Sequence, residues 1–265
     1  MAGPLLSDDL WSRMESLLPQ AKPRRFDHPG RKPLTARQVL TGILFVLKTG
    51  VRWNDLPCEM GCGSGSRCRR WLKAWTEAGV WSKLHEVLLA ELNEAGKIDW
   101  SRAAVDSPYV RARGGGEDTG PSPVDRRKVG SKHHVVVDAN GIPLAATLSS
   151  ANTPDISELE KVVDAIAPVR SKRGHPRRRP KRLLGDRGYD SDPHRAKIRR
   201  RGILARFGRR RTPHGSGLGK ERWVVERFFS WYHRFGRLRI RTDYRSKIHR
   251  ALMSLGCSLI CLRFL

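Results

Sequence analysis

The chain has 265 residues, 38% hydrophobic and 29% charged, which indicates a folded protein of one or two domains and excludes a disordered chain. Its 52 lysines and arginines outnumber 26 acidic residues, and a net charge of +26 favours DNA or RNA as partner over a small acidic substrate. The first ten residues show no signal-peptide pattern, no apolar run is long enough to span a membrane, and five cysteines form no disulfide framework, so we expect a reducing cytoplasm.

Residues 1–98 have the periodicity of helices, and we predict that they form a separate helical domain. Ser7 and Thr35 predict the N-caps of two helices, the second of which ends at Gly50. Apolar residues at helical spacing predict two more helices, over about Ser66–Ala78 and Ser82–Ala95, and a loop is expected over Gln20–Pro33.

The predicted helix Ser66–Ala78 has two different faces. One face is apolar (Cys68, Trp71, Leu72 and Trp75) and the other carries Arg67, Arg70 and Lys73. A turn followed by a basic amphipathic helix is typical of a helix-turn-helix, whose second helix enters the major groove of DNA. A charged face that is merely solvated is the alternative, and the pattern alone leaves it open.

The pattern changes after residue 98, where strands alternate with helices. A strand is predicted over Ala103–Val110, and a hairpin with Asn140-Gly141 in its turn follows over His133–Leu148. Further elements are expected in the order helix, strand, helix, strand, helix: Ser157–Ile166, Arg182–Leu184, Asp192–Arg200, Ile203–Phe207, and a long helix from about Glu221. Residues 99–265 are therefore predicted to form a mixed sheet flanked by helices.

Two strongly basic runs join these elements, Arg170–Arg182 and Arg199–Arg211. Solvated loops that add solubility are one interpretation. With the net charge so high, we favour contact with backbone phosphates, which would position a nucleic acid without reading its sequence.

Three carboxylates stand out in a chain with so few acidic residues. Asp106 lies in a predicted strand, Asp186 follows another strand, and Glu226 lies about one turn into the last long helix. Carboxylates held in this way can bind two Mg²⁺ ions, which prefer hard oxygen ligands and act together on a phosphodiester. Caps and surface salt bridges are the alternative use, because any three acidic residues can be selected afterwards.

Several long motifs occur in a fixed order along the chain: LFVLKTGVRWNDLP (44–57), AVDSPYV (104–110), TGPSPVDRRKVGSKHHVVV (119–137), NGIPLA (140–145), GDRGYD (185–190) and RWVVERFFSWYHRFGRL (222–238). Together they resemble bacterial insertion-sequence transposases of the DDE class, the insertion-sequence-five family. The resemblance implies an RNase H-like catalytic domain after an N-terminal DNA-binding domain, with Asp106, Asp186 and Glu226 as its catalytic, metal-binding carboxylates. The short intervals between them leave little room for a large inserted domain before the last helix.

The region of the glutamate departs from the pattern Tyr-x2-Arg-x3-Glu-x6-Lys of related families. Arg222 and Glu226 occupy their positions, whereas Gly219 stands for the tyrosine and His233 for the lysine. These departures put DNA-end contacts by the outer positions in doubt. Arg222, His233 and Arg237 are nevertheless expected near the helix face of Glu226, where they would contact phosphates.

We therefore expect a transposase that cleaves DNA at terminal inverted repeats and transfers the strand to target DNA, with two Mg²⁺ (or Mn²⁺) ions as cofactors. It would act as a homodimer on double-stranded DNA, in the bacterial cytoplasm at the nucleoid. The alternatives are a decayed or repurposed DNA-binding repressor and an RNase H-like nuclease that does not join strands.

Overall fold

The computed structural model describes residues 4–20, 27, 34–171, 174–211 and 217–265. Most of the predicted loop Gln20–Pro33, and residues 172–173 of the first basic run, lie outside the described residues. In the part of the chain that is described, no helix is both long and apolar enough to cross a membrane.

The N-terminal region is helical, as predicted. Its helices are α1 (Asp8–Glu15), α2 (Ala36–Thr49), α3 (Gly65–Glu77) and α4 (Val80–Glu94), with two short 3₁₀ turns, Trp53–Asp55 and Cys58–Met60, between α2 and α3. The predicted caps are confirmed. The Ser7 side chain accepts a hydrogen bond from the Leu10 amide, Thr35 forms a capping box with Gln38, and Gly50 ends α2 at φ +80°.

The second region is built on one mixed sheet. Its strands are β1 (Ala103–Asp106), β2 (Tyr109–Ala112), β3 (Gly120–Pro121), β4 (Val129–Asp138), β5 (Pro143–Ser150), β6 (Arg182–Gly185), β7 (Leu204–Phe207) and β8 (Ile240–Arg241). β4 pairs antiparallel with β5 on one edge and with β1 on the other, and β6 and β7 continue parallel to β1. Four strands therefore run in the same direction, namely β1, β5, β6 and β7. Their carboxyl ends lie at the same end of the sheet.

The predicted strand over Ala103–Val110 is interrupted. Its halves, β1 and β2, pair with different parts of the same edge of β4 and are separated by Ser107 and Pro108. Proline cannot donate a backbone hydrogen bond, so a break in the ladder there is expected. β6 lies beside β1, and β8 lies beside β2, so the sheet divides directly after Asp106.

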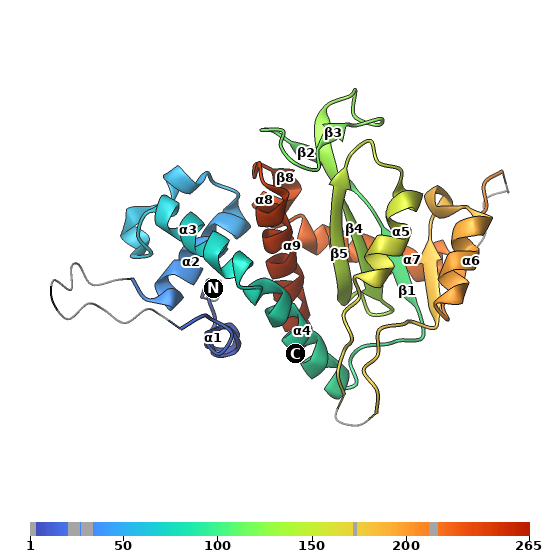
Figure 1. Cartoon of the computed structure of the whole chain (residues 1–265), viewed down its shortest axis with the longest axis horizontal. Helices are drawn as coiled ribbons and strands as arrows, with labels where there is room; N and C mark the ends of the chain where they lie inside the picture. Colours follow the sequence, from blue (N-terminus) through green and yellow to red (C-terminus); the bar gives the residue numbers. More distant parts are fainter. Residues whose placement is uncertain (1–3, 21–26, 28–33, 172–173, 212–216) are drawn as a thin grey trace.

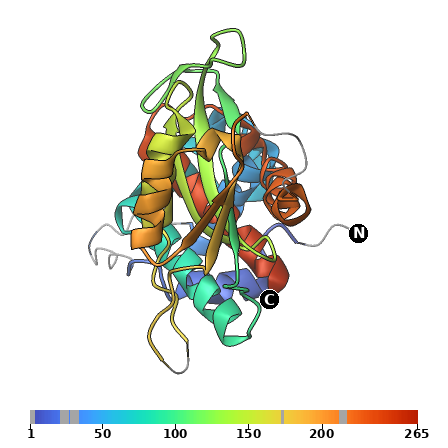
Figure 2. The same ribbon diagram turned by 90° about the vertical axis from the view of Figure 1, so that its right-hand side faces the viewer.

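Helices cover both faces of the sheet. α5 (Asp155–Asp164) packs on β4 and β5 and against α6 (Asp192–Arg200), whereas α7 (Gly219–Tyr232) packs on β1 and β4. Figure 2 shows the sheet between these two layers. Only residues 208–218 separate β7 from α7, so the chain has no large insertion before its last helices, as predicted. The predicted mixed α and β fold class, a helical region followed by a mixed sheet flanked by helices, is thus present.

The last long helix, α9 (Ser246–Cys261), joins the two regions. It packs against α4 and α3 on one side and against β5 and α7 on the other (Figure 1). Most of its residues are buried, including Cys257 and Cys261, and one continuous apolar core runs from Leu10 in α1 to Phe207 in β7. The predicted domain boundary near residue 98 stays a prediction.

The prediction that Glu226 and Arg237 share one helix face is wrong, because helix α7 ends before Arg237. Its last residue is Tyr232, and Arg237 lies in a separate short helix, α8 (Gly236–Arg239), which packs on α2. A Cβ at Gly236 would stand 2.6 Å from the Thr49 carbonyl oxygen, so only glycine allows this close approach. The apolar stripe of α7 is buried (Val225, Phe228, Phe229 and Tyr232).

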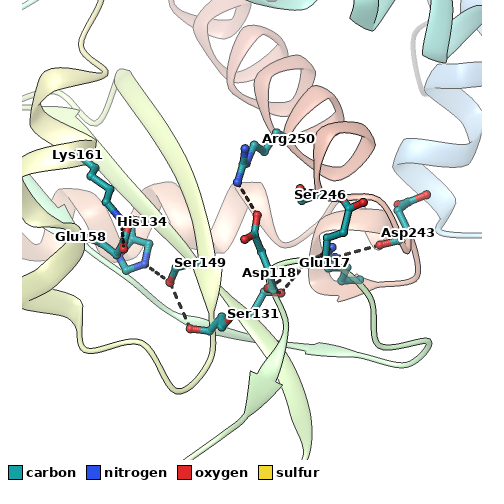
Figure 3. Close-up of polar contacts among 12 residues, drawn as sticks. Glu117, Asp118, Ser131, His134, Ser149, Glu158, Lys161, Asp243, Ser246 and Arg250 are labelled. Atoms are coloured by element: carbon teal, nitrogen blue, oxygen red, sulfur yellow. Dashed lines mark hydrogen bonds and ion pairs between the residues drawn. The ribbon is translucent and has the colours of Figure 1, made fainter.

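Arg241 in β8 is a fully buried arginine that holds loop backbone in place. Its guanidinium donates hydrogen bonds to the Ser131 hydroxyl and to four backbone carbonyls, those of Glu117, Asp118, Asp243 and Tyr244. The loop residues are also tied to α9, because Glu117 accepts from the Ser246 amide and hydroxyl and Asp118 pairs with Arg250 (Figure 3). One side chain thus satisfies backbone groups that lie between two and 124 residues away along the chain.

Candidate active site

Asp106 is the last residue of β1, at the point where the sheet divides. One of its carboxylate oxygens accepts a hydrogen bond of 2.8 Å from the Ser107 amide, which fixes the side chain at the strand end. The carboxylate remains 29% exposed, so a ligand can reach it.

Asp186 stands at the same level as Asp106. Ala103 and Ala104 pair with Leu183 and Leu184, and continuing this parallel register by two residues brings Asp106 beside Asp186. The Asp186 carboxylate accepts a 2.8 Å hydrogen bond from the Gly188 amide and so caps a 3₁₀ turn, Arg187–Tyr189. The two strand ends are linked, because the Tyr189 hydroxyl donates to Ser107 Oγ at 3.2 Å.

A further carboxylate, Asp155, lies beside this pair. It is the first residue of α5, soon after the carboxyl end of β5. A Cβ built on Gly188 would have Asp186 Oδ1 at 2.9 Å and Asp155 Oδ2 at 3.7 Å, so both oxygens lie within 4 Å of one point. The Asp155 carboxylate pairs at 2.8 Å with Lys132 Nζ, which also donates to the Thr153 carbonyl. Asp155 lies outside the sequence motifs that predicted Asp106 and Asp186. Only its position after a strand that runs parallel to β1 could have indicated that it lies near them.

The charges of these carboxylates act on one another. Burial raises the pKa of Asp106, and the negative charges of Asp186 and Asp155 raise it further. The Ser107 amide and Arg222, whose Nη2 lies 3.9 Å from Asp106 Oδ2, act in the opposite direction. The site therefore concentrates negative charge that two basic side chains, Arg222 and Lys132, offset in part.

Glu226 is placed differently. Its side chain is exposed on α7, one turn beyond Arg222, and has no ion pair among the described residues. Nor does any group of three His, Cys, Asp or Glu side chains within the described ranges form a ready metal site. The structure brings Asp106 and Asp186 together, and the role of Glu226 stays a prediction.

The predicted DNA-contacting residues lie on α3 and in or just after α7. Arg67, Arg70 and Lys73 are exposed on α3, on the face opposite the buried Cys68, Leu72 and Trp75. Arg222 is at the carboxylate pair. His233 follows the last residue of α7 and is half-buried, and burial lowers its pKa to about 4. Neutral at physiological pH, it would contact a phosphate only as a hydrogen-bond donor.

Arg237 does not suit the predicted phosphate contact. It is 3% exposed, lies over the ring of Trp53, and donates to the Val51 carbonyl at 2.8 Å and to Thr242. It also lies 3.8 Å from the buried Asp243 carboxylate. Because α7 ends at Tyr232, Arg237 is turned into the contact between α8 and α2, and we exclude it from the DNA-contacting set.

His134 of β4 makes the stability of the sheet sensitive to acid. It is fully buried, and Nε2 lies 2.7 Å from Ser149 Oγ on β5 (Figure 3). Burial lowers its pKa to about 4, so the unfolded chain binds more protons between about pH 4 and 6.5. The free energy of unfolding should therefore fall on going from pH 7.5 to pH 5, by about 2 kcal/mol for this histidine, as measured by urea unfolding.

The variant His134→Gln isolates that contribution, since glutamine can keep the bond to Ser149 without titrating. Buried Asp138, whose pKa burial raises to about 6, acts with the opposite sign because the folded state binds its proton. Comparing the variant with the wild-type chain removes this common effect. If the free energy of unfolding of His134→Gln fell between pH 7.5 and pH 5 by as much as that of the wild-type chain, the assignment would be contradicted.

The arrangement defines a class of protein. A mixed sheet with two aspartates at the carboxyl ends of neighbouring parallel strands, joined to a helical region with a basic helix, is the layout that the resemblance to DDE transposases implies. Residues 100–261 match the family "Transposase DDE domain", and residues 6–85 match "Putative transposase of IS4/5 family". The chain belongs to the family of DDE transposases.

Curated relatives agree with this assignment. Over 149 residues the chain is 56% identical to a "Putative transposase for insertion sequence element IS402" of Burkholderia cepacia, covering 56% of this chain and 71% of that protein. It is 59% identical over 123 residues to the "Insertion element IS402 uncharacterized 16.2 kDa protein" of the same organism, 46% of this chain and 84% of that protein.

A solved structure, the "Mos1 transposase paired-end complex with left transposon end", matches 95% of this chain and 85% of its own. The identity is 11% and the TM-score 0.26, too low to support any statement about this protein.

Proposed function

We propose that this transposase cleaves DNA at the ends of its insertion sequence and joins the freed 3′ end to target DNA. The observation that carries the proposal is the pair Asp106 and Asp186, held at one level by strand register and linked through Tyr189 and Ser107. In a member of the DDE transposase family, these two are the matches for the aspartates of the catalytic set.

Divalent metal ions fit the residues at this site. The donors are all carboxylate oxygens, as Mg²⁺ prefers, and the charges of Asp186 and Asp155 that raise the pKa of Asp106 would be relieved by a cation. Asp106 and Asp186 would hold the ions, with Glu226 as the third ligand. When bound, two Mg²⁺ ions (or Mn²⁺) would activate the nucleophile and stabilise the leaving oxygen of the phosphodiester.

The protein's own side chains then position the DNA. Arg222, 15% exposed at Asp106, is placed to hold a phosphate oxygen at the carboxylates. The exposed basic face of α3 would enter the major groove of the terminal inverted repeats, as in a helix-turn-helix. Residues 1–98 would form the end-binding part and residues 99–265 the catalytic part. Two ends must be joined, so a homodimer on DNA at the nucleoid is expected.

A direct test uses the purified chain with labelled duplexes that carry the ends of the element, a supercoiled target plasmid, and Mg²⁺ or Mn²⁺. We expect cleavage at the end and a covalent product joining label to plasmid, both abolished by EDTA. Binding without cleavage would indicate a DNA-binding repressor, and cleavage without joining would indicate a nuclease. Either result would contradict the proposal.

A further inference from the structure

A hollow of about 470 Å³ lies between α3 and the start of α9, away from the aspartate pair. We call it the α3–α9 hollow. Four basic residues line it, Arg69, Arg70 and Lys73 from α3 and Arg245 from the residue that precedes α9, together with Trp53 and Ser66. Its wall thus combines the helical region with the last helix of the sheet region.

The basic side chains of the hollow are not neutralised by its lining, which contains no carboxylate. Among the described residues Arg69, Arg70 and Arg245 form no ion pair, and Lys73 has only an exposed partner, Glu77, at 3.7 Å. Two nearby carboxylates are already engaged. Glu117 accepts from Ser246, and its charge faces Arg241 as well as Arg245. Asp243 is buried beside Arg237 and His249, and its charge also faces Arg69, so the two carboxylates offset only part of the positive charge. The hollow therefore keeps a net positive charge.

The wall of the hollow is also rigid. Trp53 is 8% exposed and lies under the Arg237 guanidinium, 5.5 Å from its ring centre. Gly65 at the start of α3 packs directly against the backbone of Trp53. A Cβ at Gly65 would lie 1.6 Å from the Trp53 carbonyl oxygen, so only glycine fits there. The Trp53 indole N–H is buried and has no hydrogen-bond partner within the described part of the chain.

The charge continues beyond the hollow. Arg70 also lines a second, shallower hollow of about 330 Å³ with Arg67 and Trp71, on the neighbouring side of α3. A single small anion would use one or two of these charges. A row of basic groups that extends around a helix matches a polymer of phosphates instead.

From this arrangement we infer that the α3–α9 hollow binds the backbone phosphates of double-stranded DNA through Arg69 and Arg245, beside the α3 face with Arg70 and Lys73 that is proposed to enter the major groove. The inference rests on the proposed function and adds to it a contact shared by both regions of the chain. One duplex then holds α3 and α9 at once, so end recognition and the catalytic sheet bind the same DNA segment as a unit. The contact is to the backbone and carries no sequence preference.

The test replaces each unassigned arginine, as Arg69→Gln, Arg245→Gln and the double variant, and measures binding to a fluorescent duplex without element ends, from 0.05 to 0.3 M salt. Loss of one phosphate contact should lower the slope of log K against log salt by about 0.9 and weaken binding about five- to tenfold at 0.1 M salt. The double variant should lose about twice the slope. Lys83→Gln on α4, which removes an equally exposed charge outside the hollow, serves as the matched control.

Wild-type slope and affinity in both single variants would overturn the inference, as would equal losses in Lys83→Gln, which would show only an effect of net charge. Weaker binding with an unchanged slope would also overturn it, because that marks a structural defect; thermal unfolding of each variant monitors folding. The readout needs neither cleavage nor specific ends. A wild-type chain that binds DNA but does not cleave it would thus count against the proposed function alone. Unchanged DNA binding in the hollow variants would count against the hollow alone and leave the proposed function intact.

Discussion

Replacing Asp106 or Asp186 by asparagine is expected to reduce cleavage of element ends by more than about 100-fold, while binding of DNA persists. Asparagine keeps the size of the side chain and a carbonyl oxygen for the Ser107 or Gly188 amide, so the strand ends should stay folded. The carboxylate charge that would hold the metal is lost. The loss of even an outer partner of a metal ligand costs about 10- to 100-fold, so loss of a ligand should cost more. The measurement is the rate of single-turnover cleavage in Mg²⁺ and in Mn²⁺.

The matched control is Asp192→Asn at the start of α6, whose carboxylate is 69% exposed and pairs with exposed Arg209 and with buried Arg195, which also keeps Asp190 as a partner. It should cleave at the wild-type rate, since exposed pairs contribute little. Activity of Asp106→Asn or Asp186→Asn close to that of this control would remove the catalytic assignment.

The same assay decides which residue supplies the third carboxylate. Loss of activity in Glu226→Gln, with Asp155→Asn active, would mean that α7 brings Glu226 to the aspartate pair when DNA is bound. The reverse result would give the third place to Asp155, which lies beside the pair in the free protein. Glu94→Gln, an exposed substitution on α4, controls for the change of charge.

Replacing Arg241 by alanine is expected to lower the free energy of unfolding by about 3–5 kcal/mol, the cost of leaving buried polar groups without their charged partner. Four backbone carbonyls and the Ser131 hydroxyl would lose their donor, and a large cavity would replace the side chain. In thermal unfolding this corresponds to a fall of about 10 °C in Tm for a chain of this size.

Arg239→Ala provides the comparison, because it removes an exposed arginine from α8, two residues earlier in the chain. Its effect on the free energy of unfolding should be within about 0.5 kcal/mol of zero, as for most surface changes. Arg241→Lys separates charge from geometry. Lysine keeps the charge but cannot donate to five acceptors at once, so it should recover only a small part of the loss. Equal stability of Arg239→Ala and Arg241→Ala would show that the buried bonds of Arg241 contribute nothing net.

Elements governed by neighbouring residues could be predicted from the sequence. Helix caps at Ser7 and Thr35, the stop at Gly50, and the hairpin at Asn140-Gly141 follow from the preferences of a few adjacent residues, and all are present. Asp106 and Asp186 could also be proposed, because each lies at a strand end within a distinctive motif. Their alignment with each other could not be predicted, because it depends on the register between β1 and β6, which pair residues 80 positions apart in the sequence.

Features that depend on packing between distant segments could not be predicted. Helical periodicity placed Arg237 with Glu226, but the approach of Gly236 to Thr49 ends that continuity and buries the arginine. Asp155 carries no motif, and its approach to Asp186 depends on the direction of β5 within the sheet. The α3–α9 hollow joins residues about 175 positions apart, so no local pattern could indicate it.

The position of α9 has a consequence for how the molecule is made on the ribosome. This helix fills the seam between α4 and β5, yet it is synthesised after every strand of the sheet. Until it emerges, the nascent polypeptide exposes apolar surface on both sides of that seam, where chaperones can bind. Truncations that remove α9 should consequently be degraded in the cell, even though they retain Asp106, Asp186 and Glu226.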